Sequence, residues 1–287
     1  MIKAKKSLGQ NFLIDTRVSR RIVDAVSPRD TDIIIEIGPG TGALTSLLAE
    51  RAGRVLAVEL DRRLADELRS KLARFENVSV VWHDALTLEW EDFIRRAESD
   101  FTATRGDTVP RVRVVANLPY YISTAIIDKL LVQRSRIFDM TLMLQREVVE
   151  RITSGPGSRD YGYLSVLVQY HCEASRLFDV PPEAFKPAPR VDSAVARLLV
   201  REQPAVRVQD ESKFFAVVRA CFAQRRKTIL NNLKAASSQM TFLSPIEEAL
   251  RAAGVEPRRR AETLSLAEFA ALAGALYQIA EESAFRH

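Results

Sequence analysis

Short apolar strands that alternate with helical patterns predict an α/β fold, followed by a small C-terminal unit made only of helices. Buried-strand patterns recur between residues 33 and 144, and most are separated by a helical pattern. A glycine-rich turn at residues 38–42 follows the first of them. From residue 213 to residue 280 the apolar spacing is helical throughout. Such alternation indicates a parallel sheet covered by helices, whose ligands bind at the carboxyl ends of the strands.

The first half of the chain is expected to build this sheet. Asp15 is placed to cap a helix that runs to about Val26. Unbroken apolar runs predict strands over residues 33–37, 54–59, 78–82, 112–116 and 140–144. Apolar residues at helical spacing predict helices over residues 44–52, 62–74 and 124–131.

Loops and the C-terminal helices set the expected domain boundaries. The charged stretch 91–111 contains Gly106 and Pro110 and shows no clear apolar period, so we expect a helix end and a solvated loop. A loop over residues 154–160 precedes two late strands at 171–180 and 194–200. The segment 202–209 is typical of a linker, and helices are predicted after it, over residues 213–223, 227–236, 245–253 and 266–280. We therefore expect one domain over residues 1–203 and a second over 204–287.

Composition narrows the class of protein. The 287 residues carry a formal net charge of +5, which favours a polyanionic partner such as nucleic acid. Cys172 and Cys221 form no CxxC pair, and the three histidines are scattered, so neither a disulfide framework nor a metal site is expected. The N-terminus has no signal-peptide pattern, and no apolar run is long enough to span a bilayer. We expect a cytoplasmic protein without a membrane partner.

The glycine turn indicates a cofactor that contains adenosine. Gly38, Gly40 and Ala43 satisfy the loose G-x-G-x-x-G/A fingerprint, in which glycines let the backbone approach a ligand closely. Glu59 ends the next strand and is suited to accept hydrogen bonds from ribose hydroxyls. Asp84, after the third strand, would accept from an adenine amine or cap the following helix. These residues do not distinguish a nicotinamide dinucleotide from another adenosyl cofactor.

The sequence Asn117-Leu118-Pro119-Tyr120 follows the fourth strand and favours methylation of an adenine amine. The lone pair of that amine is delocalised into the ring, and no side chain can usefully deprotonate it near neutral pH. The Asn117 side-chain oxygen and the Leu118 carbonyl would instead hold its two N–H groups, so that the lone pair faces a cofactor methyl group. Pro119 restricts this backbone and Tyr120 offers a ring face to the base. Catalysis would then rest on positioning and electrostatics.

Motifs spread over the chain resemble the KsgA family of ribosomal small-subunit RNA adenine dimethyltransferases. They are LGQNFL at residues 8–13, the glycine turn with Glu59, NLPY at 117–120 with IST at 122–124, and VPPEAF at 180–185 with VDSAV at 191–195. The helical tail is similar in residues 222–228 and 260–265. The resemblance implies a Rossmann-like fold dependent on S-adenosylmethionine, with a small helical C-terminal domain that contacts RNA or the ribosome.

The resemblance also implies roles for the matched residues. The cofactor would be held by Gln10, Asn11, Leu13, Gly38, Gly40, Glu59, Asp84 and Asn117. Within this set, Glu59 would bind the ribose, Asp84 the adenine amine, and Asn117 would lie between cofactor and target. The catalytic set would be Asn117, Leu118, Pro119, Tyr120 and Phe185. Tyr120 and Phe185 would enclose a flipped adenine, although the apolar pattern alone assigns Phe185 to the core.

The implied reaction forms N6,N6-dimethyladenosine at two adjacent adenosines of small-subunit rRNA, within an assembling 30S particle. The enzyme is expected to be a monomer. RNA phosphates would be met by Lys3, Lys5, Lys6 and the basic runs 225–227 and 258–260. Two features depart from the family: Lys186 stands where an aromatic residue is frequent, and the stretch 91–111 is long.

Three other functions stay open at this point. A large-subunit rRNA dimethyltransferase of the macrolide-resistance type shares the fold and the chemistry, but the NLPY motif and the tail favour the small-subunit family. A factor that acts mainly by binding would not need the intact cofactor residues. A nicotinamide dehydrogenase would have no use for Asn117-Leu118-Pro119-Tyr120.

Overall fold

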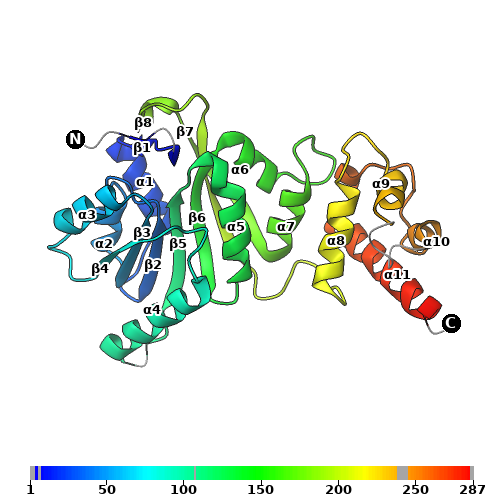
Figure 1. Cartoon of the computed structure of the whole chain (residues 1–287), viewed down its shortest axis with the longest axis horizontal. Helices are drawn as coiled ribbons and strands as arrows, with labels where there is room; N and C mark the ends of the chain where they lie inside the picture. The colour runs from blue at the N-terminus through cyan, green and yellow to red at the C-terminus, as the bar shows by residue number, and fades with distance from the viewer. Residues whose placement is uncertain (1–3, 6–7, 107, 238–244, 285–287) are drawn as a thin grey trace. The chain divides into compact units, whose positions relative to one another are not determined.

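The chain folds into two compact units, and the second is assembled from two separate stretches (Figure 1). The computed structural model describes residues 4–5, 8–106, 108–237 and 245–284. The first unit comprises residues 1–149 and 173–202, and the second comprises 150–172 and 203–287. The expected division, after residue 203, lies one residue from the last of these boundaries, which falls after residue 202. The predicted division assigned residues 150–172 to the first domain, whereas the structure groups them with the C-terminal helices.

A seven-stranded sheet forms the centre of the first unit, in the order β4-β3-β2-β5-β6-β9-β7 (Figure 1). The strands are β2 Asp32–Ile37, β3 Arg54–Glu59, β4 Val78–Trp82, β5 Arg111–Asn117, β6 Ile137–Gln145, β7 Cys172–Val180 and β9 Ser193–Val200. The five strands expected before residue 150 are confirmed, and they run parallel from β4 to β6. Strand β9 pairs antiparallel with β6, so the sheet is mixed rather than wholly parallel. The parallel part brings four strand ends that carry motifs to one edge.

Helices of the first unit connect these strands and cover the sheet. They are α1 Thr16–Val26, α2 Thr45–Ala49, α3 Arg62–Lys71, α4 Trp90–Arg105 and α5 Ser123–Val132. Asp15 caps α1 as expected, because its carboxylate accepts hydrogen bonds from the backbone N–H groups of Arg17 and Val18. Ile22 of α1 and Leu48 of α2 are buried in one apolar cluster with sheet residues such as Ile34. Helix α6, Arg146–Thr153, then carries the chain out of the first unit.

Helix α4 is the main difference from the sequence expectation. The stretch 91–111 was expected to be a helix end and a loop, but α4 spans Trp90–Arg105, so that prediction was wrong for most of the stretch. Trp90, Ile94, Ala97 and Phe101 are buried and recur every three or four residues. Most of the residues between them are charged or polar and exposed, so the stretch as a whole reads as polar and its apolar stripe is easily overlooked.

A buried ionic cluster ties four strands together near the edge opposite the glycine turn. Arg113 on β5 donates two hydrogen bonds of 2.7 Å to Asp139 on β6 and lies 3.3 Å from Asp32 on β2. Arg197 on β9 approaches the same Asp139 carboxylate at 2.7 Å. The three charged groups of Arg113, Asp32 and Asp139 are almost fully buried, so their mutual pairing offsets a large desolvation cost.

The second unit is helical and has a core of its own. Its helices are α7 Tyr163–His171, α8 Glu211–Cys221, α9 Ile229–Ala236, α10 Ile246–Ala252 and α11 Leu266–Ala284. The four helices predicted after residue 209 are confirmed, whereas α7 was not predicted. Tyr170 of α7 stacks on Phe214 of α8 with ring centroids 5.1 Å apart. This packing explains why residues 150–172 belong to the second unit.

Candidate active site

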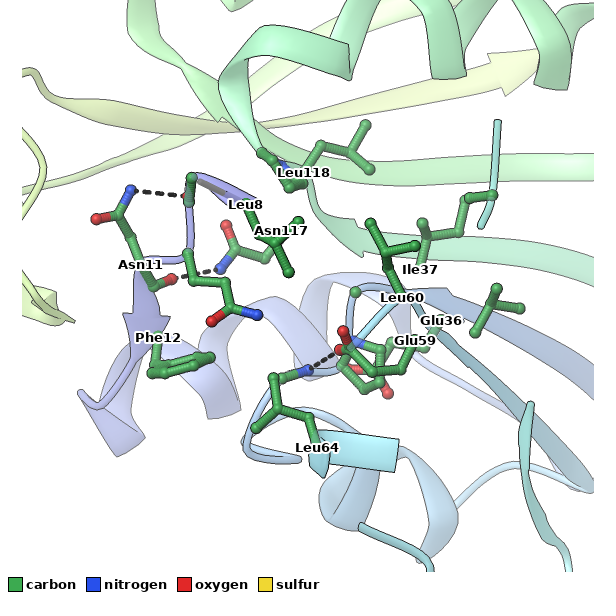
Figure 2. Close-up of a pocket in the computed structure, with 18 of the residues that line it drawn as sticks. Leu8, Asn11, Phe12, Glu36, Ile37, Glu59, Leu60, Leu64, Asn117 and Leu118 are labelled. Carbon is green, nitrogen blue, oxygen red and sulfur yellow. Dashed lines mark hydrogen bonds between the residues drawn. The ribbon is translucent and has the colours of Figure 1, made fainter. Parts of the chain in front are cut away.

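One pocket of the first unit lies where β2, β3, β4 and β5 end, and the N-terminal segment forms part of its wall (Figure 2). Every residue proposed for cofactor binding or catalysis lines it: Gln10, Asn11, Leu13, Gly38, Gly40, Glu59, Asp84, Asn117, Leu118, Pro119, Tyr120 and Phe185. The N-terminal segment reaches the pocket through a two-stranded ribbon of β1 Phe12–Leu13 and β8 Phe185–Lys186. This antiparallel pairing sets Leu13 opposite Phe185, so segments from the two ends of the first unit meet in the pocket wall.

The glycine turn after β2 brings bare backbone into the pocket. Gly38 and Gly40 have φ angles of +69° and +57°, a region that glycine adopts without strain. A Cβ atom on Gly40 would lie 3.1 Å from the Phe12 ring, so a larger residue would press on the N-terminal segment. The Gly40 N–H donates to a Glu59 carboxylate oxygen at 3.1 Å, and the Asp61 N–H donates to the other at 2.9 Å. The turn and the end of β3 are therefore locked together.

Two carboxyl groups of this pocket have raised pKa values. Burial raises the pKa of Glu59, and the hydrogen bonds from Asp61 and Gly40 act in the opposite direction. Burial raises the pKa of Glu36, on β2, to about 8, and the nearby charge of Glu59 adds to this effect. Among the described residues, Glu36 Oε2 is buried without a hydrogen-bond partner. Burial therefore favours the neutral form of this carboxyl in the pocket wall.

By contrast, Asp61 sits just outside the pocket as a stable anion. Its carboxylate accepts from Arg63 and lies 3.2 Å from Lys5 Nζ, and these hydrogen bonds hold its pKa well below the usual range. The Lys5–Asp61 pair joins the N-terminal segment to the start of α3. Lys5 was expected to meet RNA, but this contact engages it within the protein.

Asn117 and Leu118 are held by backbone groups of two different segments. The Asn117 amide nitrogen donates to the Asn11 carbonyl at 3.2 Å (Figure 2), which orients the side-chain oxygen as an acceptor. The Leu118 N–H donates to the Met143 carbonyl of β6 at 3.2 Å, and its side chain is buried. Both features fix the position of Leu118, whose carbonyl belongs to the next peptide, toward Pro119. After Pro119 the chain forms a short 3₁₀ helix, Tyr120–Ile122.

The two aromatic residues proposed to hold a target base are placed differently. Tyr120 is partly exposed, and its hydroxyl shares a 2.7 Å hydrogen bond with Ser193 Oγ at the start of β9. Burial raises the Tyr120 pKa, so the phenol stays protonated. Phe185 is only 4% exposed and packs in the apolar cluster that includes Leu13. Phe185 therefore belongs to both the core and the pocket wall.

Asp84 lines the pocket and also caps a turn. Its carboxylate accepts a hydrogen bond of 2.8 Å from the Leu86 N–H, which caps a turn rather than the expected helix, because the next helix begins only at Trp90. A carboxylate has about four acceptor sites, so this bond leaves capacity for a ligand amine. Capping of this turn and binding of an amine by Asp84 are therefore compatible.

Sequence reasoning missed several lining residues. Leu60 and His83 directly follow strands β3 and β4, and the rule that ligands bind beyond strand ends would have found them. Phe12 and Leu64 add apolar surface to the pocket. Tyr121, between two motif residues that were singled out, lines the pocket and is 63% exposed. No signal in the sequence separates its exposure from that of Tyr120.

The basic runs of the second unit differ in availability. Arg226, Lys227, Arg258 and Arg260 are exposed. Arg259 forms an ion pair with Glu268 at the start of α11 and holds the loop before that helix, so it serves the fold. Arg225 is exposed and donates to the Arg159 carbonyl. Lys3 and Lys6 lie outside the described residues.

In the part of the chain that the structure describes, no helix is both long and apolar enough to cross a membrane. Within the same residues, no group of three or more His, Cys, Asp or Glu side chains is arranged to hold a metal ion.

A parallel sheet with this glycine turn, an acid at the end of the next strand and fixed acceptors after the fourth defines a Rossmann-like methyltransferase. The model of the ribosomal RNA adenine dimethylase family matches residues 1–272. The chain belongs to this family, and the family expected from its motifs is thereby confirmed.

Individual relatives agree with this assignment. Ribosomal RNA small subunit methyltransferase A of Anoxybacillus flavithermus is 49% identical over 281 residues, which covers 98% of this chain and 92% of that protein. The protein of the same name from Moorella thermoacetica is 47% identical over 272 residues, 95% of this chain and 92% of the relative. The solved 23S rRNA methyltransferase ErmE has a TM-score of 0.68 and 29% identity, over 93% of this chain and 99% of its own. A dimethyladenosine transferase from Plasmodium falciparum shares the fold, with a TM-score of 0.72, 24% identity, and coverage of 91% and 95%.

Proposed function

We propose that this protein is a cytoplasmic, monomeric enzyme that uses S-adenosylmethionine to dimethylate the N6 amines of two adjacent adenosines in small-subunit rRNA, within an assembling 30S particle. The observation that carries the proposal is the similarity to small-subunit methyltransferases A, at 49% identity over 98% of the chain. The 23S rRNA enzyme ErmE, which acts on the other subunit, is 29% identical. This difference favours the small subunit.

The pocket fits the cofactor in its chemistry. S-adenosylmethionine would supply a methyl group on a positively charged sulfur, already activated for transfer. Gly38 and Gly40 line the pocket with bare backbone, and the Glu59 carboxylate can accept ribose hydroxyls beside its two backbone N–H donors. Asp84 would accept from the adenine amine. The unpartnered Glu36 Oε2 is a further polar group that a bound ligand would satisfy.

The chain itself would position the target amine. Asn117 Oδ1 and the Leu118 carbonyl accept its two N–H groups; hydrogen bonds hold the Asn117 amide to the Asn11 carbonyl and the Leu118 N–H to the Met143 carbonyl. Held in this way, the nitrogen lone pair is directed out of the base plane without any change in protonation. Tyr120 and Phe185 would contact the base. The rate acceleration then comes from orientation and preorganised acceptors.

The second unit would contribute phosphate contacts. Arg226, Lys227, Arg258 and Arg260 are exposed cations on one helical unit, and such groups bind RNA in a salt-dependent manner. Phosphate contacts do not depend on the RNA sequence, so the pocket and its surroundings would select the target adenosines.

The test is a methyl-acceptor assay with purified protein, tritiated S-adenosylmethionine and unmethylated small or large ribosomal subunits, followed by nucleoside analysis. We expect label in dimethyladenosine from small subunits. Label from large subunits alone would move the activity to the ErmE type. Cofactor binding without label in either would indicate a factor that acts by binding, and a deletion strain rescued by Asn117→Ala would support that outcome.

A further inference from the structure

Tyr121 presents an aromatic ring to solvent at the catalytic motif. It lines the same pocket as Tyr120, yet 63% of it is exposed, whereas Tyr120 is partly buried and hydrogen-bonded to Ser193. Large aromatic side chains gain free energy from burial, so a ring left open beside a pocket has surface available for a ligand.

The structure also holds this ring in place. A Cβ atom on Gly9 would lie 3.2 Å and 3.3 Å from Cε1 and Cδ1 of Tyr121, so the ring rests against the Gly9 backbone. The Ile122 N–H donates to the Pro119 carbonyl at 3.2 Å, and the Ser123 hydroxyl donates to the Tyr120 carbonyl at 3.0 Å. These bonds fix the backbone on both sides of Tyr121. The ring is therefore supported on one side and open on the other.

We propose that Tyr121 is a stacking platform for the nucleotide next to the target adenosine. This inference rests on the proposed function, because it requires an RNA substrate. Single-stranded RNA is commonly bound by stacking unstacked bases on aromatic side chains. When one base enters the pocket beside Tyr120, the adjoining base remains at the mouth, where the next residue of the chain offers its ring. When two adjacent adenosines are the targets, the base next to one of them is the other adenine. Adenine is a purine, and a purine presents a large π-face for stacking.

Stacking of this kind has a distinct kinetic signature. The adjoining base takes no part in methyl transfer, so its contact would stabilise the bound complex and the transition state equally. Loss of the contact should raise KM for the ribosomal substrate while kcat stays the same. From the usual strength of base–aromatic stacking, KM should rise about 5- to 150-fold.

The experiment compares Tyr121→Ala, Tyr121→Leu, Tyr121→Phe and Tyr121→Trp with the unmodified protein, on whichever subunit accepts methyl groups. We expect a raised KM in the alanine and leucine variants, and a KM within about 2-fold of the original in the two aromatic variants. Affinity for S-adenosylhomocysteine, measured by calorimetry, should be unchanged in all four. Val132→Ala is a matched control, since Val132 is 68% exposed and is not among the described residues that line the pocket.

Three results would overturn the inference. An unchanged KM in Tyr121→Ala would make Tyr121 an ordinary surface residue. A leucine variant that behaves like phenylalanine would show that bulk matters and the aromatic ring does not. A fall in kcat together with weaker S-adenosylhomocysteine binding would show that Tyr121 supports the pocket structurally.

A second measurement separates this inference from the proposed function, because it needs no methyl transfer. Short RNA oligonucleotides carrying 2-aminopurine beside an adenosine would be saturated with protein, and stacking on Tyr121 should quench the fluorescence. We expect more quenching with the unmodified protein than with Tyr121→Leu. Equal quenching would refute the platform even if small-subunit methylation is observed. Unequal quenching would support it even if the acceptor proves to be another RNA.

Discussion

Replacing Glu36 with glutamine should remove a large pH dependence from the stability of the first unit. Glutamine keeps the size and shape of the side chain but cannot ionise. Glu36 is buried, and its pKa in the folded protein is about 8, against an ordinary value of 4.5. Between these two values the folded chain holds a proton on Glu36 that the unfolded chain has released.

The sign and size of the effect follow from this difference. A raised pKa stabilises the folded state fully below pH 4.5, and that stability is lost as the pH rises through 8. The free energy of unfolding should therefore fall by about 1.4 kcal/mol per pH unit within this window. Over the whole window the loss is on the order of 5 kcal/mol. The other titratable groups are shared with the variant, so the difference between the two proteins reports Glu36 together with its interaction with Glu59.

The assay is urea unfolding at several pH values from 5 to 8, followed by tryptophan fluorescence. The two tryptophans, Trp82 and Trp90, both lie in the first unit, so the signal reports the unit that contains Glu36. We expect the stability of the original protein, relative to Glu36→Gln, to decrease steadily with pH. A difference that does not change with pH would refute the argument, because it would mean that Glu36 is already ionised in the fold.

Three further predictions concern the fold and the pocket. Arg113→Ala should lower the free energy of unfolding by about 3–5 kcal/mol, because it removes the cation that pairs with buried Asp32 and leaves buried Asp139 with Arg197 alone. Loss of the exposed pair through Arg176→Ala should cost under about 1 kcal/mol, and equal effects in urea unfolding would contradict this. Ile94→Ala should lower the free energy of unfolding by about 2–5 kcal/mol, because it leaves a cavity under α4, whereas the exposed Arg95→Ala should change it little. A small effect of Ile94→Ala would argue that this face of α4 is not buried. Tyr120→Phe loses the hydrogen bond to Ser193, so it should lower the free energy of unfolding by about 1 kcal/mol and leave kcat unchanged. Tyr120→Ala should lower kcat/KM in the methyl-acceptor assay. Equal kcat/KM in the alanine variant and the original protein would exclude the ring from base binding.

The sequence was informative where local pattern and topology decide the structure. The strand at residues 32–37 contains four isoleucines, and these β-branched residues favour a buried strand without any tertiary information. Residues such as Glu59 and Asn117 follow parallel strands, so the topology alone brings them to one edge of the sheet. This is why the proposed site residues converge on one pocket.

The remaining features depend on contacts that no local pattern encodes. The β1–β8 ribbon pairs Leu13 with Phe185, and two-residue strands carry no detectable period. The stacking of Tyr170 on Phe214 assigns α7 to the second unit. The exposure of Tyr121 and the unpartnered oxygen of Glu36 are set by the packing of side chains around them. Such properties follow from three-dimensional neighbours.

The interleaving of the two units has a consequence for synthesis. Residues 150–172 leave the ribosome before β9, so the nascent chain begins its second unit while its first is unfinished. Until residue 200 has emerged, β6 has no partner on its β9 side, and a bare strand edge invites pairing with other chains. Tyr161 and Tyr170 must wait still longer, because Phe214 and Phe269 of their shared core are made last.

The wait is long on the scale of folding. At about 5–20 residues per second, the chain from residue 145 to residue 200 takes about 3–11 s to synthesise. The first unit cannot complete its sheet until residues 150–172 of the second unit have already been made, unlike the first of two domains in series. A newborn copy of this protein therefore exposes strand edge and aromatic surface together for seconds, which makes it a natural client for chaperones that shield nascent chains.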